Sequence, residues 1–264
     1  MRLKVKMINL VSIITPSYNS SKYIGKTIES IFMQSYVDWE LIIVDDCSTD
    51  NSIDIINSYA EKDIRIKLIQ LKKNSGAAVA RNTGIEQANG RFIAFLDSDD
   101  TWHPDKLKNQ TGFMLKNNYA FTYTAYHKVD ENGHYLSAVK IPEQTNYHEL
   151  LKTCVIGCLT AMYDTELLGK IKFPLIRKRQ DFALWLKILK KVPFAYGLDD
   201  DLAGYTIRSD SISANKFKAA QYNWHLYRNI EQLSLFKSIY YFSHYMIRGI
   251  IRTKFPELAQ KFKI

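Results

Sequence analysis

The sequence predicts an α/β fold, a mostly parallel sheet flanked by helices, with a helical extension at the C-terminal end. In the first hundred residues, short β-branched runs alternate with segments of helical periodicity. The runs are largely apolar, as expected for strands whose two faces are both covered by helices. With 264 residues, 46% apolar and 24% charged, the chain has the size and composition of a soluble globular protein with one large core.

Strands and helices are expected to follow one another along the N-terminal part. The strands are expected over residues 11–15, 41–44, 66–71 and 92–96. The helices between them are expected over residues 22–34, 51–59 and 76–88. Ser48, Thr49 and Asp50 offer N-caps for the second of these helices.

The alternation weakens beyond residue 100. The elements expected there are a helix over residues 104–118, a strand over 121–126, a helix over 180–191 and one or two amphipathic helices over 217–251. We therefore divide the chain into an α/β domain of residues 1–215 and a basic amphipathic helical tail of residues 216–264.

Polar clusters follow three of the predicted strands, at residues 15–19, 45–48 and 97–100. In open α/β sheets, ligands bind beyond the carboxyl ends of the strands. The three clusters are therefore expected to converge on one crevice.

The most specific cluster contains Asp97, Ser98, Asp99 and Asp100. Three carboxylates in four residues repel one another unless a cation or donor group lies among them. A hard divalent cation with oxygen ligands suits such a cluster, and a diphosphate would complete its coordination shell. The alternative is that Asp100 caps the helix expected to begin near Pro104.

Three further positions have both a structural and a functional interpretation. Asp46 could cap the next helix, or accept hydrogen bonds from the imide of uracil or from ribose hydroxyls. Arg81, in a helix of small residues, could form a surface salt bridge or reach into the crevice. Asp181, near the start of a helix, could be a stabilising first-turn acid or a general base.

Two other nucleotide-binding motifs and a zinc site are not supported. Gly25, Lys26 and Thr27 resemble the end of a phosphate-binding loop, but Ser20 stands where that loop needs a glycine. No G-x-G-x-x-G follows a predicted strand. The three cysteines have no spacing typical of a zinc site, and we interpret them as reduced structural thiols.

Taken together, the motifs resemble those of the family 2 glycosyltransferases. Enzymes of this family invert the configuration at the anomeric carbon and have the GT-A fold, which is built on a Rossmann-like sheet. The resemblance covers residues 10–210, in the family's order, and is carried by residues 15–19, 44–50, 80–84 and 95–100 and by Gln180, Asp181 and Trp185. The sequence is most similar to bacterial transferases that build capsule, teichuronic acid or lipopolysaccharide.

The resemblance implies a role for each candidate residue. The donor-binding residues would be Thr15, Pro16, Tyr18, Asp46, Arg81, Asp97 and Ser98, with uracil held by the first four. Asp99, with Asp97, would hold Mn²⁺ or Mg²⁺, and Asp181 would be the catalytic base. The acceptor-side candidates are Trp102, Gln180 and Trp185.

The implied activity is transfer of a sugar, with inversion, from a UDP-sugar to a saccharide or lipid-linked acceptor in cell-surface polysaccharide biosynthesis. One alternative is a sugar nucleotidyltransferase, which would need a glycine-rich loop after the first strand, and residues 16–19 supply none. The other is a catalytically inactive GT-A binding module, which would be expected to lose the metal-binding aspartate or the base. No nucleic-acid partner is expected.

The tail carries most of the chain's net charge of +9, since nine Lys/Arg and two Asp/Glu lie from Lys216 onward. Residues 233–251 are long enough to span a bilayer, but Lys237, His244 and Arg248 interrupt them. We expect the tail to rest on an anionic membrane without crossing it, or alternatively to pack against the α/β domain. The expected location is cytoplasmic, peripheral at the inner face of the bacterial membrane.

Overall fold

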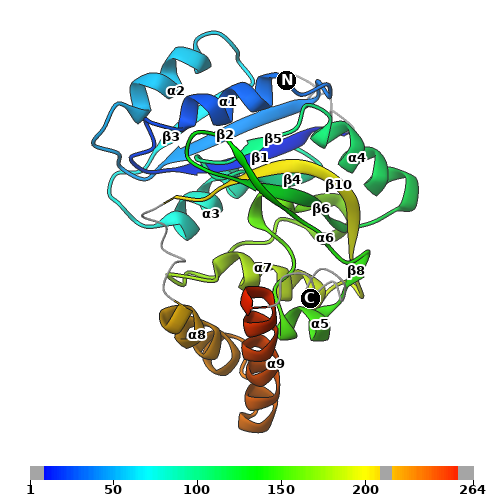
Figure 1. Ribbon diagram of the computed structural model, residues 1–264. Coiled ribbons are helices and arrows are strands. Elements are labelled where there is room, and N and C mark those ends of the chain that lie inside the picture. Colours follow the sequence, from blue (N-terminus) through cyan, green and yellow to red (C-terminus); the bar gives the residue numbers. More distant parts are fainter. Residues whose placement is uncertain (1–8, 209–215, 255–264) are drawn as a thin grey trace.

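The computed structural model describes residues 9–208 and 216–254, and within them ten strands form one sheet covered by helices on both faces (Figure 1). The strand order is β3-β2-β1-β4-β9-β6-β10-β5, with β7 beside β6 and β8 beside β10. The strands are β1 Val11–Ser17, β2 Trp39–Asp45, β3 Ile66–Gln70, β4 Phe92–Phe95, β5 Thr101–Trp102, β6 Phe121–Val129, β7 Tyr135–Val139, β8 Gln144–Thr145, β9 Met162–Asp164 and β10 Ala195–Thr206.

The helices are α1 Ile24–Phe32, α2 Ser52–Ala60, α3 Ala77–Gln87, α4 Lys106–Asn117, α5 Tyr147–Lys152, α6 Thr165–Leu168, α7 Gln180–Leu189, α8 Lys216–His225 and α9 Leu235–Lys254. A 3₁₀ turn, η1, covers Cys158–Thr160, and a π-helical turn, η2, covers Leu226–Ile230. The predicted α/β class and the predicted elements of the first hundred residues are confirmed.

The N-terminal half is the parallel part of the sheet, because β3, β2, β1 and β4 all run in the same direction. Ile13 and Ile14 of β1 are fully buried on opposite faces, one against each hydrophobic cluster. α3 approaches β1 so closely that a Cβ on Gly84 would lie 2.6 Å from the Cγ2 of Ile14. The glycine is therefore required for this helix to pack onto the strand.

The C-terminal half is mixed, and the sequence predicted little of it. β9 runs antiparallel to both β4 and β6, whereas the long strand β10 is parallel to β6. β10 carries Asp199, Asp200 and Asp201 in its middle, where its pairing register shifts. Three consecutive charged residues interrupt the apolar pattern by which a strand is recognised, and for this reason the sequence did not predict β10.

The tail packs against the rest of the molecule. Leu226, Tyr227 and Tyr241 belong to the larger hydrophobic cluster, and the Tyr227 hydroxyl donates to the carbonyl of Leu151 at 2.5 Å. None of the helices in residues 9–208 and 216–254 is both long and apolar enough to cross a membrane. The predicted domain boundary falls after residue 215. Residues 209–215 and 255–264 lie outside the described part of the chain. The division into domain and tail stays a prediction.

Candidate active site

A cleft of about 560 Å³ opens beyond the carboxyl ends of the strands. Asp97 and Asp99, which follow β4, line one side of it, and Arg208 reaches it from the end of β10. Asp181 of α7 and Tyr222 of α8 also line it. Residues far apart in the sequence thus meet in one concave site.

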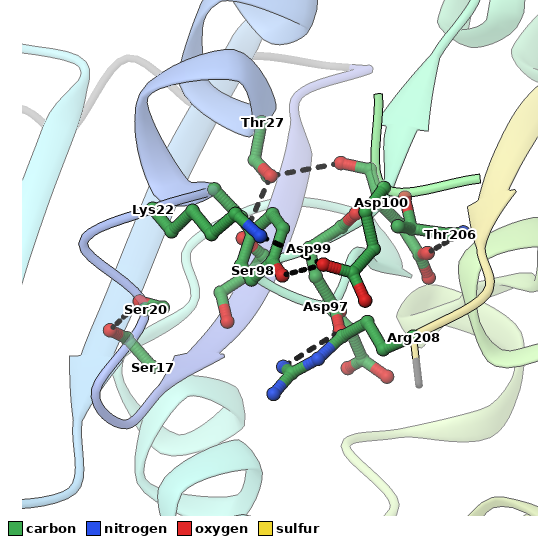
Figure 2. A network of polar contacts seen from close by, with 12 residues as sticks. Ser17, Ser20, Lys22, Thr27, Asp97, Ser98, Asp99, Asp100, Thr206 and Arg208 are labelled. Atoms are coloured by element: carbon green, nitrogen blue, oxygen red, sulfur yellow. Dashed lines mark hydrogen bonds and ion pairs between the residues drawn. The ribbon is translucent and has the colours of Figure 1, made fainter. Parts of the chain in front are cut away.

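The aspartate loop after β4 is held by hydrogen bonds from two other elements (Figure 2). The Thr27 hydroxyl of α1 donates to the carbonyls of Ser98 and Asp100, at 3.0 and 2.9 Å. The backbone N–H of Thr206, in β10, donates to the carboxylate of Asp100 at 2.9 Å. Asp100 therefore does not cap α4, and that alternative is wrong because its carboxylate is bound to the end of β10.

The environment of Asp99 and Asp100 disfavours their charged forms. Burial raises the pKa of Asp99, and the Asp97 carboxylate raises it further. Burial also raises the pKa of Asp100 well above its usual value, with added contributions from Asp99 and Asp97. Arg208 offsets part of this charge, with its guanidinium 3.3 Å from Asp99.

The chemistry of this donor set fits a hard divalent cation. Asp97 and Asp99 offer carboxylate oxygens, which such cations prefer, and a positive charge would relieve the repulsion that raises the pKa of Asp99. In the described part of the chain, no three metal-ligating side chains form a group that could hold an ion. A cation between the two aspartates would therefore need further oxygen ligands from a bound donor.

Arg81 joins the aspartate loop to the start of α7. Its guanidinium donates to Asp97 at 2.5 Å and to the side-chain oxygen of Gln180 at 3.1 Å. Burial disfavours its charge, but Asp97, then Cys158 and Asp181, outweigh this and raise the pKa of Arg81. The alternative of a surface salt bridge is wrong, because Arg81 is only 8% exposed.

Asp181 lies in the first turn of α7 and reaches the cleft. The residue before the helix, Arg179, has a φ of +62° and provides no side-chain cap. All residues from Phe182 to Leu189 except Lys187 are buried in the larger cluster, so the helix is fixed in the core. Asp181 is thereby held on a rigid element beside Arg81.

Asp46 has a structural role in the loop after β2. Its two carboxylate oxygens accept hydrogen bonds from the backbone N–H groups of Ser75 and Gly76, each at 2.7 Å. These amides directly precede α3, so Asp46 ties the second strand to that helix. Its carboxylate oxygens are already occupied, and its role toward uracil stays a prediction.

The other predicted donor-binding residues differ in how far their side chains are exposed to solvent. Thr15 is fully buried, and within the described residues its hydroxyl has no hydrogen-bond partner. Tyr18 is half exposed, whereas Pro16 and Ser98 are partly buried. None of the four lines the cleft itself. Their contact with a nucleotide is therefore a prediction about loops next to the cleft.

Two of the acceptor-side candidates lie in the core instead. Trp102 is 3% exposed, its indole N–H donates to the carbonyl of Leu159 at 2.8 Å, and the Lys106 ammonium lies 3.6 Å from its ring centre. Trp185 is fully buried. Neither side chain reaches the surface, so their burial does not support contact with an acceptor, and that contact stays a prediction. Gln180 does line the cleft, although its amide is engaged with Arg81.

Sequence reasoning missed part of the cleft wall. Arg208 follows β10 and Tyr222 lies in α8, and neither segment carries a recognisable motif. The basic run at residues 177–179 also lines the cleft. Its three consecutive positive charges immediately before a predicted helix are a signal that could have been used.

The fold and the site define a GT-A glycosyltransferase: a mixed sheet whose N-terminal half is parallel, an Asp-x-Asp loop after a central strand, and a carboxylate facing that loop from a helix. The predicted mostly parallel sheet is therefore correct only for the N-terminal half. The family model described as glycosyl transferase family 2 matches residues 12–171, and the chain belongs to this family.

The chain is similar to curated and solved members over nearly its whole length. It is 49% identical to the TuaG glycosyltransferase of Bacillus subtilis, named for teichuronic acid biosynthesis, over 89% of this chain and 94% of that one. It is 41% identical to Escherichia coli WfgD, named as a UDP-Glc:α-D-GlcNAc-diphosphoundecaprenol β-1,3-glucosyltransferase, over 93% and 96%. The structure of S. aureus TarS 1–349 with UDP-GlcNAc matches at a TM-score of 0.71 and 25% identity, covering 92% of this chain and 74% of that one.

Proposed function

We propose that this enzyme transfers a sugar, with inversion, from a UDP-sugar to a saccharide or lipid-linked acceptor. The observation that carries the proposal is one cleft that Asp97, Asp99 and Asp181 line together. TarS, which is similar over most of the chain, was crystallised with UDP and with UDP-GlcNAc. The names of TuaG and WfgD support a role in cell-surface polysaccharide synthesis.

In this mechanism Asp181 takes the proton of the acceptor hydroxyl while its oxygen attacks the anomeric carbon, opposite the leaving diphosphate. One base suffices, because direct displacement needs no covalent intermediate. Asp97 and Asp99 would hold Mn²⁺ or Mg²⁺, whose charge, when bound, neutralises the leaving diphosphate. Arg81 binds both Asp97 and Gln180 at the start of α7, and so it fixes the position of Asp181 relative to the aspartate loop.

Measurement of UDP release with and without acceptor tests the proposal. A transferase should release UDP from a UDP-sugar much faster when a saccharide acceptor is present. A sugar nucleotidyltransferase would instead produce diphosphate from UTP and a sugar phosphate, and an inactive binding module would bind UDP without turnover. Either of those outcomes would contradict the proposed transfer.

Donor binding should depend on a divalent cation. UDP is expected to bind at least about tenfold more tightly with Mn²⁺ than with a chelator, because without a bridging cation the diphosphate meets the carboxylates of Asp97 and Asp99 directly. Titration calorimetry in both conditions measures this ratio. The Asp99→Ala variant should lose the dependence on Mn²⁺, while the distant Asp54→Ala variant should keep it. Equal affinity of the unaltered enzyme in the two conditions would contradict the metal-bridged site.

We also propose that α9 docks on an anionic membrane surface. One side of the helix packs inward through Ser238 and Tyr241. The other side, here called the α9 apolar face, is exposed and consists of Leu235, Phe236, Ile239, Tyr240, Met246, Ile247 and Ile250. No acidic residue occurs in α9, whereas Lys237 adjoins the exposed face. Apolar side chains flanked by positive charge fit an interface of anionic lipids. The predicted inner-face location stays a prediction.

Substitution within the α9 apolar face should release the protein from vesicles. Phe236→Asp combined with Ile247→Asp is expected to lower partitioning onto anionic liposomes by about tenfold or more, since it removes apolar insertion and adds negative charge. Co-sedimentation measures the bound fraction. Ile64→Asp is the matched control, because Ile64 is 92% exposed and lies far from α9 in the sequence. Unchanged partitioning of the double variant would contradict membrane docking by α9.

A further inference from the structure

A basic run precedes α7 and forms one wall of the cleft. It consists of Arg177, Lys178 and Arg179, all of which line the cavity next to Asp181. The Lys178 ammonium lies 5.2 Å from the ring centre of Tyr222, so the wall continues onto α8. The proposed donor site is centred on a different element of the cleft, the aspartate loop after β4.

The arginines of the two sides differ in how their charge is compensated. On the donor side, Arg81 pairs with Asp97 at 2.5 Å and Arg208 pairs with Asp99 at 3.3 Å. On the α7 side, among residues 9–208 and 216–254, neither Arg177 nor Arg179 forms an ion pair with a carboxylate. Within the described residues, the charges of Arg177 and Arg179 beside Asp181 are therefore not balanced by a carboxylate, and an anionic ligand could bind them.

The second arginine of the run is held in a fixed place. Arg179 has a φ of +62° and donates to the Tyr245 hydroxyl of α9 at 2.8 Å. Its guanidinium carbon also lies 5.7 Å from the centre of that ring. The partner is a neutral phenol, so the contact orients the guanidinium without cancelling its charge. The same contact links the cleft wall to the helix that carries the α9 apolar face.

We propose that Arg177 and Arg179, with Lys178 beside them, form a subsite for a phosphate or diphosphate group carried by the acceptor. Guanidinium groups bind phosphate oxygens through paired, charge-assisted hydrogen bonds. An acceptor anchored there by its phosphate would present its sugar toward Asp181. The proposal rests on the proposed transfer function, and it adds the chemical class of the acceptor and the residues that select it.

Acceptor preference tests the subsite. Two soluble acceptors are compared with the same UDP-sugar donor: octyl GlcNAc, and octyl-diphosphate-linked GlcNAc, which differs only by its diphosphate. The unaltered enzyme should prefer the diphosphate acceptor. Arg177→Gln with Arg179→Gln should raise its KM about 10- to 100-fold, the loss expected for charge-assisted hydrogen bonds, without raising the KM of the donor.

Two further variants keep the result interpretable. Arg177→Gln alone should show part of the loss, and because Arg177 is exposed this variant should fold normally. Lys187→Gln removes an exposed positive charge farther along α7, outside the cleft, and should retain the preference. An equal loss toward both acceptors would overturn the proposal, as would a raised KM for the donor, which would assign the run to the donor diphosphate.

Binding separates failure of the subsite from failure of the transfer activity. If the unaltered enzyme releases no UDP from any donor, the transfer proposal fails. Calorimetry with the octyl-diphosphate acceptor, at saturating UDP, still tests the subsite. The Arg177→Gln, Arg179→Gln protein should bind at least about tenfold more weakly, and equal affinity would overturn the proposal. Competition by anionic vesicles, lost in that variant, would overturn it by assigning the run to lipid headgroups.

Discussion

The Asp181→Asn variant is expected to lose about 10²- to 10⁴-fold in kcat, the usual contribution of general base catalysis. Asn has nearly the same size as Asp but cannot take a proton from the acceptor hydroxyl. Asp181 lines the cleft beside Arg81 and lies in the first turn of α7. The loss should appear in kcat, while UDP and Mn²⁺ binding stay largely intact, because the donor side of the cleft is unchanged.

The competing interpretation makes Asp181 only a stabilising first-turn acid. That role is worth about 0.3–1 kcal/mol of folding free energy and would leave kcat nearly normal. Asp54 is the matched control, because it is an exposed acid in the first turn of α2. Asp54→Asn should lower stability as much as Asp181→Asn does, without a loss in kcat. Near-normal turnover of Asp181→Asn on its true acceptor would require another base.

The parallel half of the fold could be predicted because its signals are local. β1 and β2 are largely apolar, are buried on both faces as expected, and each predicted strand was found. The aspartate loop and Asp181 could be placed together because strand ends and helix starts have recognisable residues. The mixed half depends on pairing between distant segments. β9 has only three residues, Met162–Asp164, and becomes a strand only because it fills the space between β4 and β6.

Burial was the main source of error in the site. A motif shows which residues are near one another, but it does not show which of them reach the surface. Asp181 and Trp185 lie one turn apart on the same side of α7, yet Asp181 borders the cleft and Trp185 is fully buried, because the helix enters the core after its first turn. The bridging role of Arg81 was also missed, since it requires Asp97 and Gln180 to be close in space.

Trp185 packs in the core next to the site and supports it from the interior of the protein. Its ring centre lies 5.3 Å from that of Phe121, 5.8 Å from Phe95 and 6.4 Å from Phe173. Phe173 in turn lies under Arg81, with the guanidinium carbon 5.4 Å from its ring centre. An aromatic cluster therefore supports both α7 and the arginine that connects α7 to the aspartate loop.

The Trp185→Ala variant should lose about 3–5 kcal/mol of unfolding free energy, because it leaves a large cavity among buried aromatic rings. Trp185→Phe should cost much less, since it keeps most of the packing and removes an indole N–H that has no partner within the described residues. Denaturant unfolding measures both, and acceptor kinetics of Trp185→Phe distinguish support from contact. A supporting side chain leaves the acceptor KM near normal in Trp185→Phe. A KM raised tenfold or more at unchanged stability would mean that Trp185 reaches the acceptor after all, through a movement of α7 that exposes it.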